Sequence, residues 1–160
     1  MSKKYRLFRY LLEFIATGFY TGLMPYAPGT FASLLACFFI LPLLLYILKD
    51  PLFYIVFLFL SFYFGLYLYK KTMGEEKDAK RFVWDEFVGM WISCFPLIFF
   101  SGNIVFWVVP AFIIFRFLDI VKPSFIGMID KRDGVWAVML DDVLSGILTA
   151  LIIIVIYFLT

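Results

Sequence analysis

The sequence predicts an all-α polytopic membrane protein, a bundle of about five spanning helices with an interfacial helix at the N-terminus. Of its 160 residues, 64% are hydrophobic and 22% are aromatic, and the mean hydropathy is +0.99. A water-soluble domain with so much apolar surface would aggregate, so the composition indicates a lipid environment. No linker or low-complexity stretch divides the chain. We therefore expect one membrane domain over 1–160, with an interfacial segment at 1–26 and the bundle at 27–160.

Four runs without charged residues are candidates for spanning helices, which need roughly 20 mostly apolar residues. They cover residues 31–48, 51–69, 87–115 and 143–160. The first two are joined by a turn at 49–51 and should form a hairpin. The third contains Ser101, Gly102 and Asn103 near its middle, which is a strong turn signal, so it forms either one long span or two short ones.

The placement of lysine and arginine decides between these two topologies. If the chain turns back at 101–103 it crosses five times, and 13 of the 14 basic residues share a side with the N-terminus while Lys49 lies opposite. A single span would divide them 9 against 5. The positive-inside rule therefore favours the turn and puts the basic side in the cytoplasm. The two legs, 85–100 and 103–118, are short for a bilayer, which would draw their polar ends to the depth of the lipid phosphates.

The N-terminal segment is expected to lie along the cytoplasmic membrane surface. Residues 5–24 are too interrupted to span, but Leu7, Leu11 and Phe14 fall on one helical stripe. Four basic residues can contact lipid headgroups: Lys3, Lys4, Arg6 and Arg9. The segment resembles the basic start of a signal peptide but lacks a small-residue cleavage site, so we expect it to stay in the mature protein.

Acidic residues from distant parts of the sequence reach one membrane face in the five-crossing topology. They are Asp85, Glu86, Asp119, Asp130, Asp133, Asp141 and Asp142. A charge near hydrocarbon costs about 2.5–3.5 kcal/mol at mid-membrane, and clustered carboxylates also repel one another. One interpretation is that they are solvated charges flanking helices, and it stays open for Asp130 and Asp133. For the full set we favour a bound cation.

The donor types indicate a hard divalent ion with oxygen ligands. The chain has no histidine, and Cys37 and Cys94 fall inside apolar runs where we expect reduced, buried thiols, so zinc is disfavoured. The acidic pairs at 85–86 and 141–142 should each open a helix. Gly89 and Gly146 follow four residues after one member of each pair and would clear room on that helix face.

A second group of polar residues could hold a phosphate. Gly29 ends a loop, Thr30 is a candidate N-cap, and Ser33 falls in the first helical turn, where free backbone N–H groups can bind an anion. Ordinary helix capping is the alternative. Three cations fall near the same interface: Arg81, Arg116 and Lys122. For the two arginines we prefer binding to lipid headgroups.

Four sequence blocks occur in order over nearly the whole chain. They are Ala-Pro-Gly-Thr-Phe-Ala-Ser-Leu at 27–34, Val-Trp-Asp-Glu-Phe-Val-Gly at 83–89, Arg-Phe-Leu-Asp-Ile-Val-Lys-Pro at 116–123 and Met-Leu-Asp-Asp-Val-Leu-Ser-Gly at 139–146. Together they resemble the phosphatidylglycerophosphatase A family. Ala32 stands where glycine is frequent in that family and Ser145 where alanine is frequent, and both residues are small. The resemblance implies magnesium-dependent removal of the terminal phosphate from phosphatidylglycerol phosphate, giving phosphatidylglycerol at the bacterial inner membrane.

On this resemblance, one or two Mg²⁺ ions are expected on carboxylates of the acidic set. The ligands, which are also the expected catalytic residues together with Lys122, are Asp85, Glu86, Asp119, Asp141 and Asp142, with Asp130 and Asp133 as secondary candidates. The residues expected to bind the substrate phosphate are Gly29, Thr30, Ser33, Arg116 and Lys122. The nucleophile is either water or Asp119, which could form a phospho-aspartyl intermediate. The expected partners are the lipid substrate and membrane lipids, not nucleic acid, and the oligomeric state stays open.

Two other functions are compatible with clustered intramembrane acids. A CDP-alcohol phosphotransferase also uses aspartates, and Asp133-Gly134 begins like its motif, but the Ala-Arg step that should follow is missing. A divalent-cation transporter would place carboxylates near mid-bilayer, with helices broken there. Histidine-dependent phosphatases are excluded because the chain has no imidazole, and cysteine phosphatases because no arginine follows Cys94 at the required spacing.

Overall fold

The computed structural model describes residues 3–74, 79–132 and 134–160, and these residues form helices joined by turns, with no strand. The long helices are α1 Lys3–Ala16, α2 Pro28–Leu35, α3 Leu41–Ile47, α4 Pro51–Thr72, α5 Trp84–Cys94, α6 Ile104–Val121, α7 Ser124–Asp130 and α8 Val135–Leu159. Three short helical turns join them: η1 Thr21–Leu23, η2 Ala36–Ile40 and η3 Phe95–Phe99. The all-α prediction is confirmed. Asp133 and the side chains of Lys3 and Lys4, singled out above, lie outside this description.

Four helical stretches of the described chain are long and apolar enough to cross a membrane: 28–47, 51–72, 104–121 and 135–159. A fifth, shorter leg consists of the 11 residues of α5 and the 5 residues of η3. The chain turns back after it, because Gly102 adopts a φ of 95° and Asn103 caps α6 by accepting the Val105 N–H at 3.0 Å. The predicted turn at 101–103 is therefore confirmed, and 87–115 is not one span.

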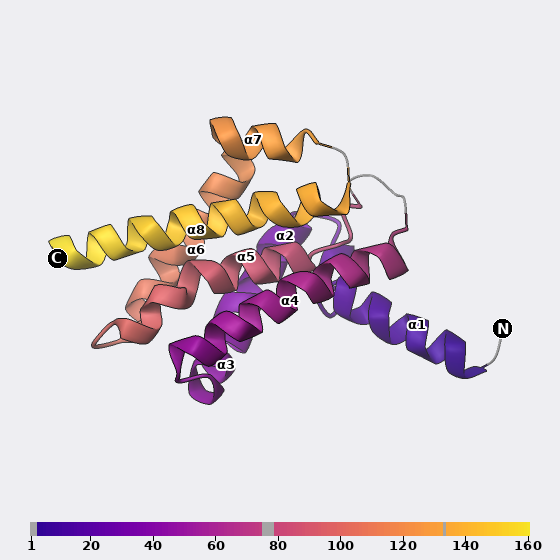
Figure 1. Ribbon diagram of the computed structural model, residues 1–160, viewed down its shortest axis with the longest axis horizontal. Helices are drawn as coiled ribbons and strands as arrows, with labels where there is room; N and C mark the ends of the chain where they lie inside the picture. The colour runs from indigo at the N-terminus through magenta and orange to yellow at the C-terminus, as the bar shows by residue number, and fades with distance from the viewer. Residues whose placement is uncertain (1–2, 75–78, 133) are drawn as a thin grey trace.

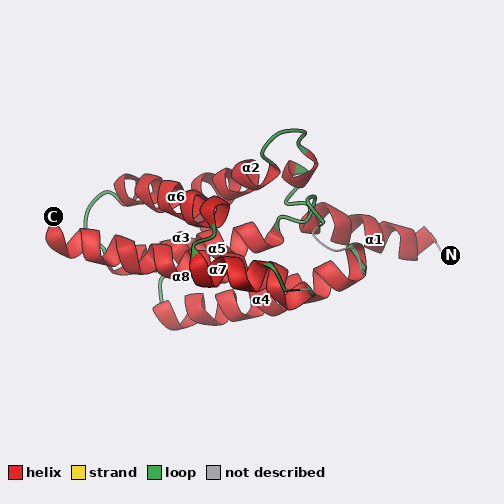
Figure 2. Cartoon of the chain, turned by 90° about the horizontal axis from the view of Figure 1, so that it is seen from above, coloured by secondary structure: helices red, strands yellow, loops and turns green. Residues whose placement is uncertain are grey.

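α5 and α8 run side by side along the long axis of the molecule, and α6 crosses α8 obliquely (Figures 1 and 2). Prolines adjust two of them. Pro42 follows directly after the π turn η2, and Pro96 lies at the start of the tighter turn η3. Proline lacks an N–H group and therefore removes one helical hydrogen bond, which favours such local changes in winding.

The starts of two helices differ from the sequence predictions. α2 begins at Pro28, with Ala27 in the N-cap position, so the expectation that Thr30 is the N-cap is wrong. Proline suits the first helical position because its fixed φ matches the helix and no N–H bond is lost there. α8 begins at Val135, after Gly134 with a φ of 114°, so the acidic pair at 141–142 does not open this helix. The apolar residues at 135–140 extend the helix because Ala137 and Met139 are buried against its neighbours.

Two glycines let α5 and α8 approach closely. A Cβ atom on Gly146 would lie 2.5 Å from the Gly89 carbonyl oxygen, and one on Gly89 would lie 2.7 Å from the Asp142 carbonyl oxygen. Small residues commonly permit such contacts between membrane helices. Ser93, buried beside this contact, donates its hydroxyl to the Gly89 carbonyl of its own helix at 2.9 Å. The contact fixes α5 at Gly89 against the stretch of α8 from Asp142 to Gly146.

α1 is a helix as predicted, and only its second half packs on the bundle. Leu12 and Ala16 are buried in a cluster with Leu66 and Tyr69 of α4. The first half extends away from the other helices toward the N-terminus, and its Leu7 side chain is 62% exposed (Figure 1). Its placement on a membrane surface stays a prediction.

Candidate active site

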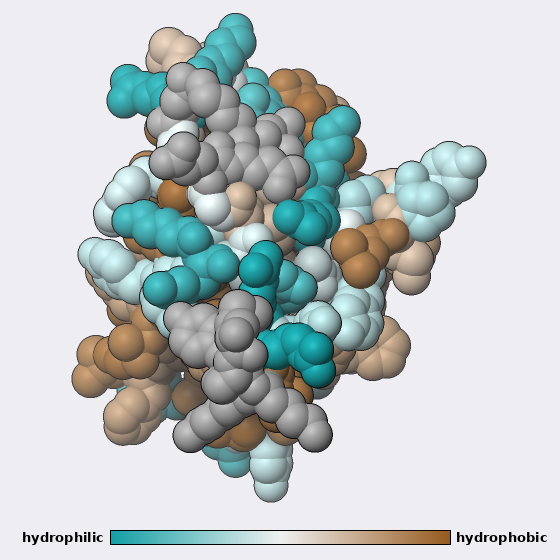
Figure 3. Space-filling model, turned by 90° about the vertical axis from the view of Figure 1, so that its right-hand side faces the viewer, coloured by the Kyte–Doolittle hydropathy of each residue, from teal (hydrophilic) through white to brown (hydrophobic). Residues whose placement is uncertain are grey.

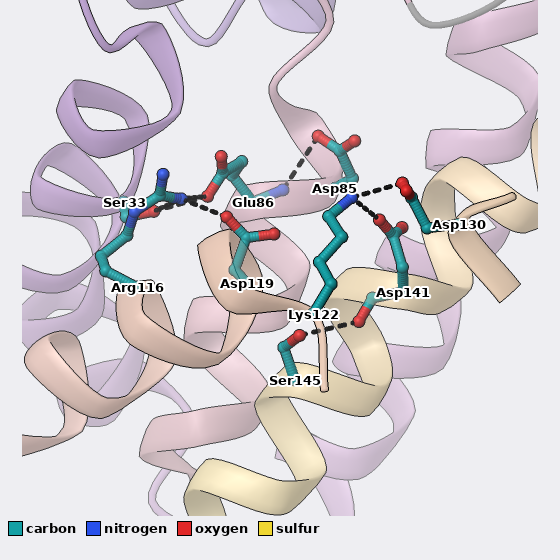
Figure 4. A network of polar contacts seen from close by, with 9 residues as sticks. All are labelled: Ser33, Asp85, Glu86, Arg116, Asp119, Lys122, Asp130, Asp141 and Ser145. Atoms are coloured by element: carbon teal, nitrogen blue, oxygen red, sulfur yellow. Dashed lines mark hydrogen bonds and ion pairs between the residues drawn. The ribbon is translucent and has the colours of Figure 1, made fainter. Parts of the chain in front are cut away.

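Five carboxylates meet at the end of the bundle where α5 begins and α6 ends, here called the acidic end; Figure 4 draws all of them except Asp142. α5 contributes Asp85 and Glu86 in its first turn, α6 contributes Asp119 near its end, and α8 contributes Asp141 and Asp142 in its second turn. The four aspartates are each less than 10% exposed: 9% at Asp85, 9% at Asp119, 5% at Asp141 and 4% at Asp142. Buried charges of one sign require compensation nearby.

Three of these carboxylates have the spacing of a metal site. Asp119, Asp141 and Asp142 each present one oxygen, and these three oxygens lie within 4.8 Å of one another. Asp141 Oδ1 is buried and has no hydrogen-bond partner among the described residues. Carboxylate oxygens are the donors that hard cations such as Mg²⁺ prefer, so the residues present fit such an ion. Asp85 and Glu86 were also predicted as ligands. They lie at the same end of the bundle, but among the described residues they are not part of this closely spaced group.

Arg116 joins two of the acids from inside the bundle. Its Nη1 atom forms ion pairs with Glu86 and with Asp119 Oδ2, the latter at 2.9 Å, and its side chain is only 13% exposed. Ser33 donates its hydroxyl to Glu86 Oε2 at 2.8 Å. The preferred interpretation of Arg116 as a ligand of lipid headgroups is therefore wrong. Two buried carboxylates hold the guanidinium inward, where charge-assisted bonds are strong.

Lys122 compensates the acids on the other side. It caps the end of α6 with a φ of 47°, and its ammonium group bonds to Asp130 of α7 and to Asp141 Oδ2, the latter at 2.6 Å. Partial burial acts to lower the pKa of Lys122, but the bonds to Asp130 and Asp141 outweigh burial and raise this pKa above its ordinary value. Lys122 is thus a cation at any physiological pH. Asp130, a secondary candidate above, belongs to this network.

The start of α2 lies directly against the acids. A Cβ atom on Gly29 would lie 1.8 Å from Glu86 Oε1, so only glycine permits this approach. Ser33, one turn further along α2, is fully buried and bonds to Glu86. Thr30 lies between them in the first turn and is partly buried. The phosphate-binding role of this helix start stays a prediction, and the contact the structure provides is with a carboxylate.

An open cavity of about 250 Å³ lies over the carboxylates. Its lining includes predicted site residues, among them Gly29, Asp85 and Lys122. Five lining residues were not anticipated from the sequence: Ala79, Lys80, Phe82, Val83 and Val138. Figure 3 looks onto this end of the molecule, where hydrophilic side chains gather. The residues at 79–83 carry no periodic pattern, so only the position of their loop in space associates them with the site.

Sequence comparisons identify proteins that are similar to this chain. The chain matches the family model described as phosphatidylglycerophosphatase A over residues 14–157. It is 35% identical over 145 residues to phosphatidylglycerophosphatase A of Haemophilus influenzae, covering 89% of this chain and 86% of that protein. It is 39% identical over 140 residues to phosphatidylglycerophosphatase A of Escherichia coli, covering 85% and 77%.

A third relative carries a different name. The chain is 35% identical over 152 residues, covering 90% of its own length and 92% of the relative, to a Bacteroides thetaiotaomicron protein that bears the name of a phosphatidylinositol-3-phosphatase. No solved structure matches the chain. Both names describe enzymes that remove a phosphate from a phospholipid.

Proposed function

Because this chain belongs to the phosphatidylglycerophosphatase A family, we propose that it hydrolyses the terminal phosphomonoester of phosphatidylglycerol phosphate, releasing phosphatidylglycerol and phosphate. One observation supports this proposal above the others. Asp119, Asp141 and Asp142 come from two helices to one buried group beneath an open cavity. Carboxylates at helix ends also argue against a transporter, which would place them near the middle of the membrane.

The proposal includes Mg²⁺ as cofactor, with Asp119, Asp141 and Asp142 as the residues that would hold it. Bound there, a magnesium ion would withdraw charge from the phosphate oxygens and make a water molecule more acidic. The unpaired Asp141 Oδ1 and the all-oxygen donor set support this assignment.

The remaining charged residues have separate proposed roles. Lys122, held beside Asp141, would orient a phosphate oxygen at the floor of the cavity. Arg116 would keep Glu86 and Asp119 in place, because its guanidinium is committed to both. Asp85 lines the cavity outside the triad and would accept the proton of the attacking water, since the chain has no histidine for this step.

We also propose that the protein lies in the bacterial inner membrane with the acidic end facing the cytoplasm. In the five-crossing topology 13 of the 14 lysine and arginine residues share that side. Such a bias in the short loops orients membrane proteins with their basic side in the cytoplasm. The substrate would then reach the cavity from the inner leaflet.

The decisive experiment measures phosphate release from a panel of lipid phosphates by the purified protein. The panel contains phosphatidylglycerol phosphate, phosphatidic acid and phosphatidylinositol 3-phosphate, each with Mg²⁺ and with a chelator. We expect release from phosphatidylglycerol phosphate that requires Mg²⁺ and is lost in Asp141→Asn. A preference for the inositol lipid would assign the substrate named for the Bacteroides relative instead. Release from no lipid would refute the proposal and favour a cation transporter.

A further inference from the structure

Residues 79–83, which lead into α5, form one wall of the cavity, and hydrogen bonds on both sides of Lys80 fix their backbone. Phe82 donates its N–H group to the Ala79 carbonyl at 2.7 Å. Val83 donates its N–H group to the carbonyl of Ala16, at the end of α1, at 3.1 Å. The position of the Lys80 backbone is therefore set by bonds within the loop and by a bond to a distant helix.

Packing reinforces this placement. The Phe82 ring is buried and packs edge-on against Tyr69 of α4, with ring centroids 4.9 Å apart. On the other side, Gly22 packs so closely on the loop that a Cβ atom there would lie 2.2 Å from the Arg81 carbonyl oxygen. Residues 79–83 are therefore held between α4 and the turn after α1, which gives their backbone a defined path along the cavity.

Lys80 differs from the other lysine that lines the cavity. Lys122 is committed to Asp130 and Asp141 at the floor. Lys80 is exposed at the rim, and within the part of the chain that the structure describes no carboxylate pairs with it. No described carboxylate neutralises its ammonium group, so an anion that enters the cavity can bind it at the level of the exposed rim.

The proposed substrate carries an anion at that level. Phosphatidylglycerol phosphate has a terminal phosphomonoester and a second phosphate, the diester that joins its glycerol headgroup to the diacylglycerol. Only a glycerol unit separates the two phosphates, so a terminal phosphate held among the floor residues would keep the diester close to the cavity. Resting on the function proposed above, we propose that Lys80 binds this phosphodiester and makes the enzyme selective for lipids with two phosphates over phosphatidic acid, which has only the monoester.

The test compares kcat/KM on phosphatidylglycerol phosphate and on phosphatidic acid, in micelles of an uncharged detergent. Lys80→Ala should lower kcat/KM on the two-phosphate lipid by about tenfold, the factor expected for one charge-assisted hydrogen bond, and leave phosphatidic acid unchanged. Lys80→Arg should keep most of the selectivity, because it retains the charge. Lys70→Ala is the matched control, since Lys70 is an exposed lysine in the last turn of α4 that does not line the cavity.

Each other outcome contradicts a defined part of the reasoning. An equal loss on both lipids, or no loss on either, would overturn the role of Lys80. A loss that appears only in vesicles rich in anionic lipid, and equally in Lys70→Ala, would show that Lys80 binds bulk headgroups and not the substrate. If the unsubstituted protein releases no phosphate from phosphatidylglycerol phosphate, the proposed function itself fails, and this outcome is seen before any variant is compared.

Discussion

The close contact of α5 with α8 predicts that Gly146→Ala will inactivate the enzyme without unfolding it. The added Cβ atom would lie 2.5 Å from the Gly89 carbonyl oxygen and 3.1 Å from Ile92 Cβ. Carbon–oxygen contacts between helices ordinarily measure about 3.3–3.6 Å, so the two helices must separate by about 1 Å. Asp85 belongs to α5 and Asp141 belongs to α8, so separating the two helices moves these two carboxylates apart.

The size of the effect follows from that displacement. A misplacement of about 1 Å at a reacting centre can cost about 100-fold in rate, whereas overpacking usually costs about 1–3 kcal/mol of stability. We therefore expect kcat/KM of Gly146→Ala to fall by about 100-fold, with a cooperative unfolding transition retained. The assay is the initial rate of phosphate release from phosphatidylglycerol phosphate, with thermal unfolding measured on the same detergent preparation.

Gly65→Ala provides the matched control. A Cβ atom on this α4 glycine would lie 2.6 Å from Met139 Cε, the far end of a flexible side chain, and 2.8 Å from the Trp84 ring. We expect a loss of stability of the same kind but activity within about threefold of the unsubstituted protein, because α4 carries no acid of the site. Full activity in Gly146→Ala, or equal losses of activity in both variants, would refute the idea that the glycine contact sets the geometry of the acids.

Three further predictions concern the charged network. Asp142→Asn should raise the Mg²⁺ concentration for half-maximal activity by at least about tenfold, since it removes one oxygen of the triad, and an unchanged magnesium titration would contradict that role. Lys122→Gln should destabilise the protein by leaving Asp141 without its cation. Because the pKa of Lys122 is raised, its stabilising pairing with Asp141 is fully present below the ordinary lysine pKa and is lost only as pH rises through the raised value. The Tm difference from the unsubstituted protein should therefore be constant between about pH 7 and about pH 9. Ser33→Ala removes one bond to Glu86 and should lower kcat/KM by about three- to tenfold, and an effect confined to stability would show that Ser33 serves only packing.

The topology could be predicted because charge and turn signals are local. Lys49 alone opposed the other basic residues, and the turn at 101–103 has glycine and asparagine in the positions that the structure uses. The start of α8 differs from the prediction because the last run without charges begins only at Val143, after the acidic pair. Only the burial of Ala137 and Met139 against neighbouring helices shows that 135–140 extend α8. Hydropathy identifies a helix core better than its ends.

The acidic residues of the site could be predicted from the sequence, but the positions of the basic residues around them could not. Sequence spacing indicated that acids from α5, α6 and α8 share one face. It did not indicate that Arg116 points inward, because a basic residue at the end of an apolar helix fits lipid headgroups equally well. Nothing in the sequence sets Lys80 apart from the other charges of both signs at 75–81. Its relation to the cavity depends on hydrogen bonds to residues as distant as Ala16.

The end of α6 explains how so many acids can be held together. Arg116, Asp119 and Lys122 follow one another at three-residue intervals, and cations near a helix C-terminus are favoured by the helix dipole. Arg116 binds Glu86 of α5, and Lys122 binds Asp141 of α8, so α6 links two helix segments that would otherwise repel each other.

These two ion-paired cations compensate only part of the negative charge at the acidic end. When the five carboxylates of α5, α6 and α8 are all ionised, Arg116 and Lys122 neutralise only two of them, and a phosphate dianion entering the cavity would add to the remaining negative charge. Burying such a surplus is costly, because the interior screens charge poorly. The divalent cation proposed at Asp119, Asp141 and Asp142 would offset this surplus when the substrate binds, in addition to its proposed part in hydrolysis.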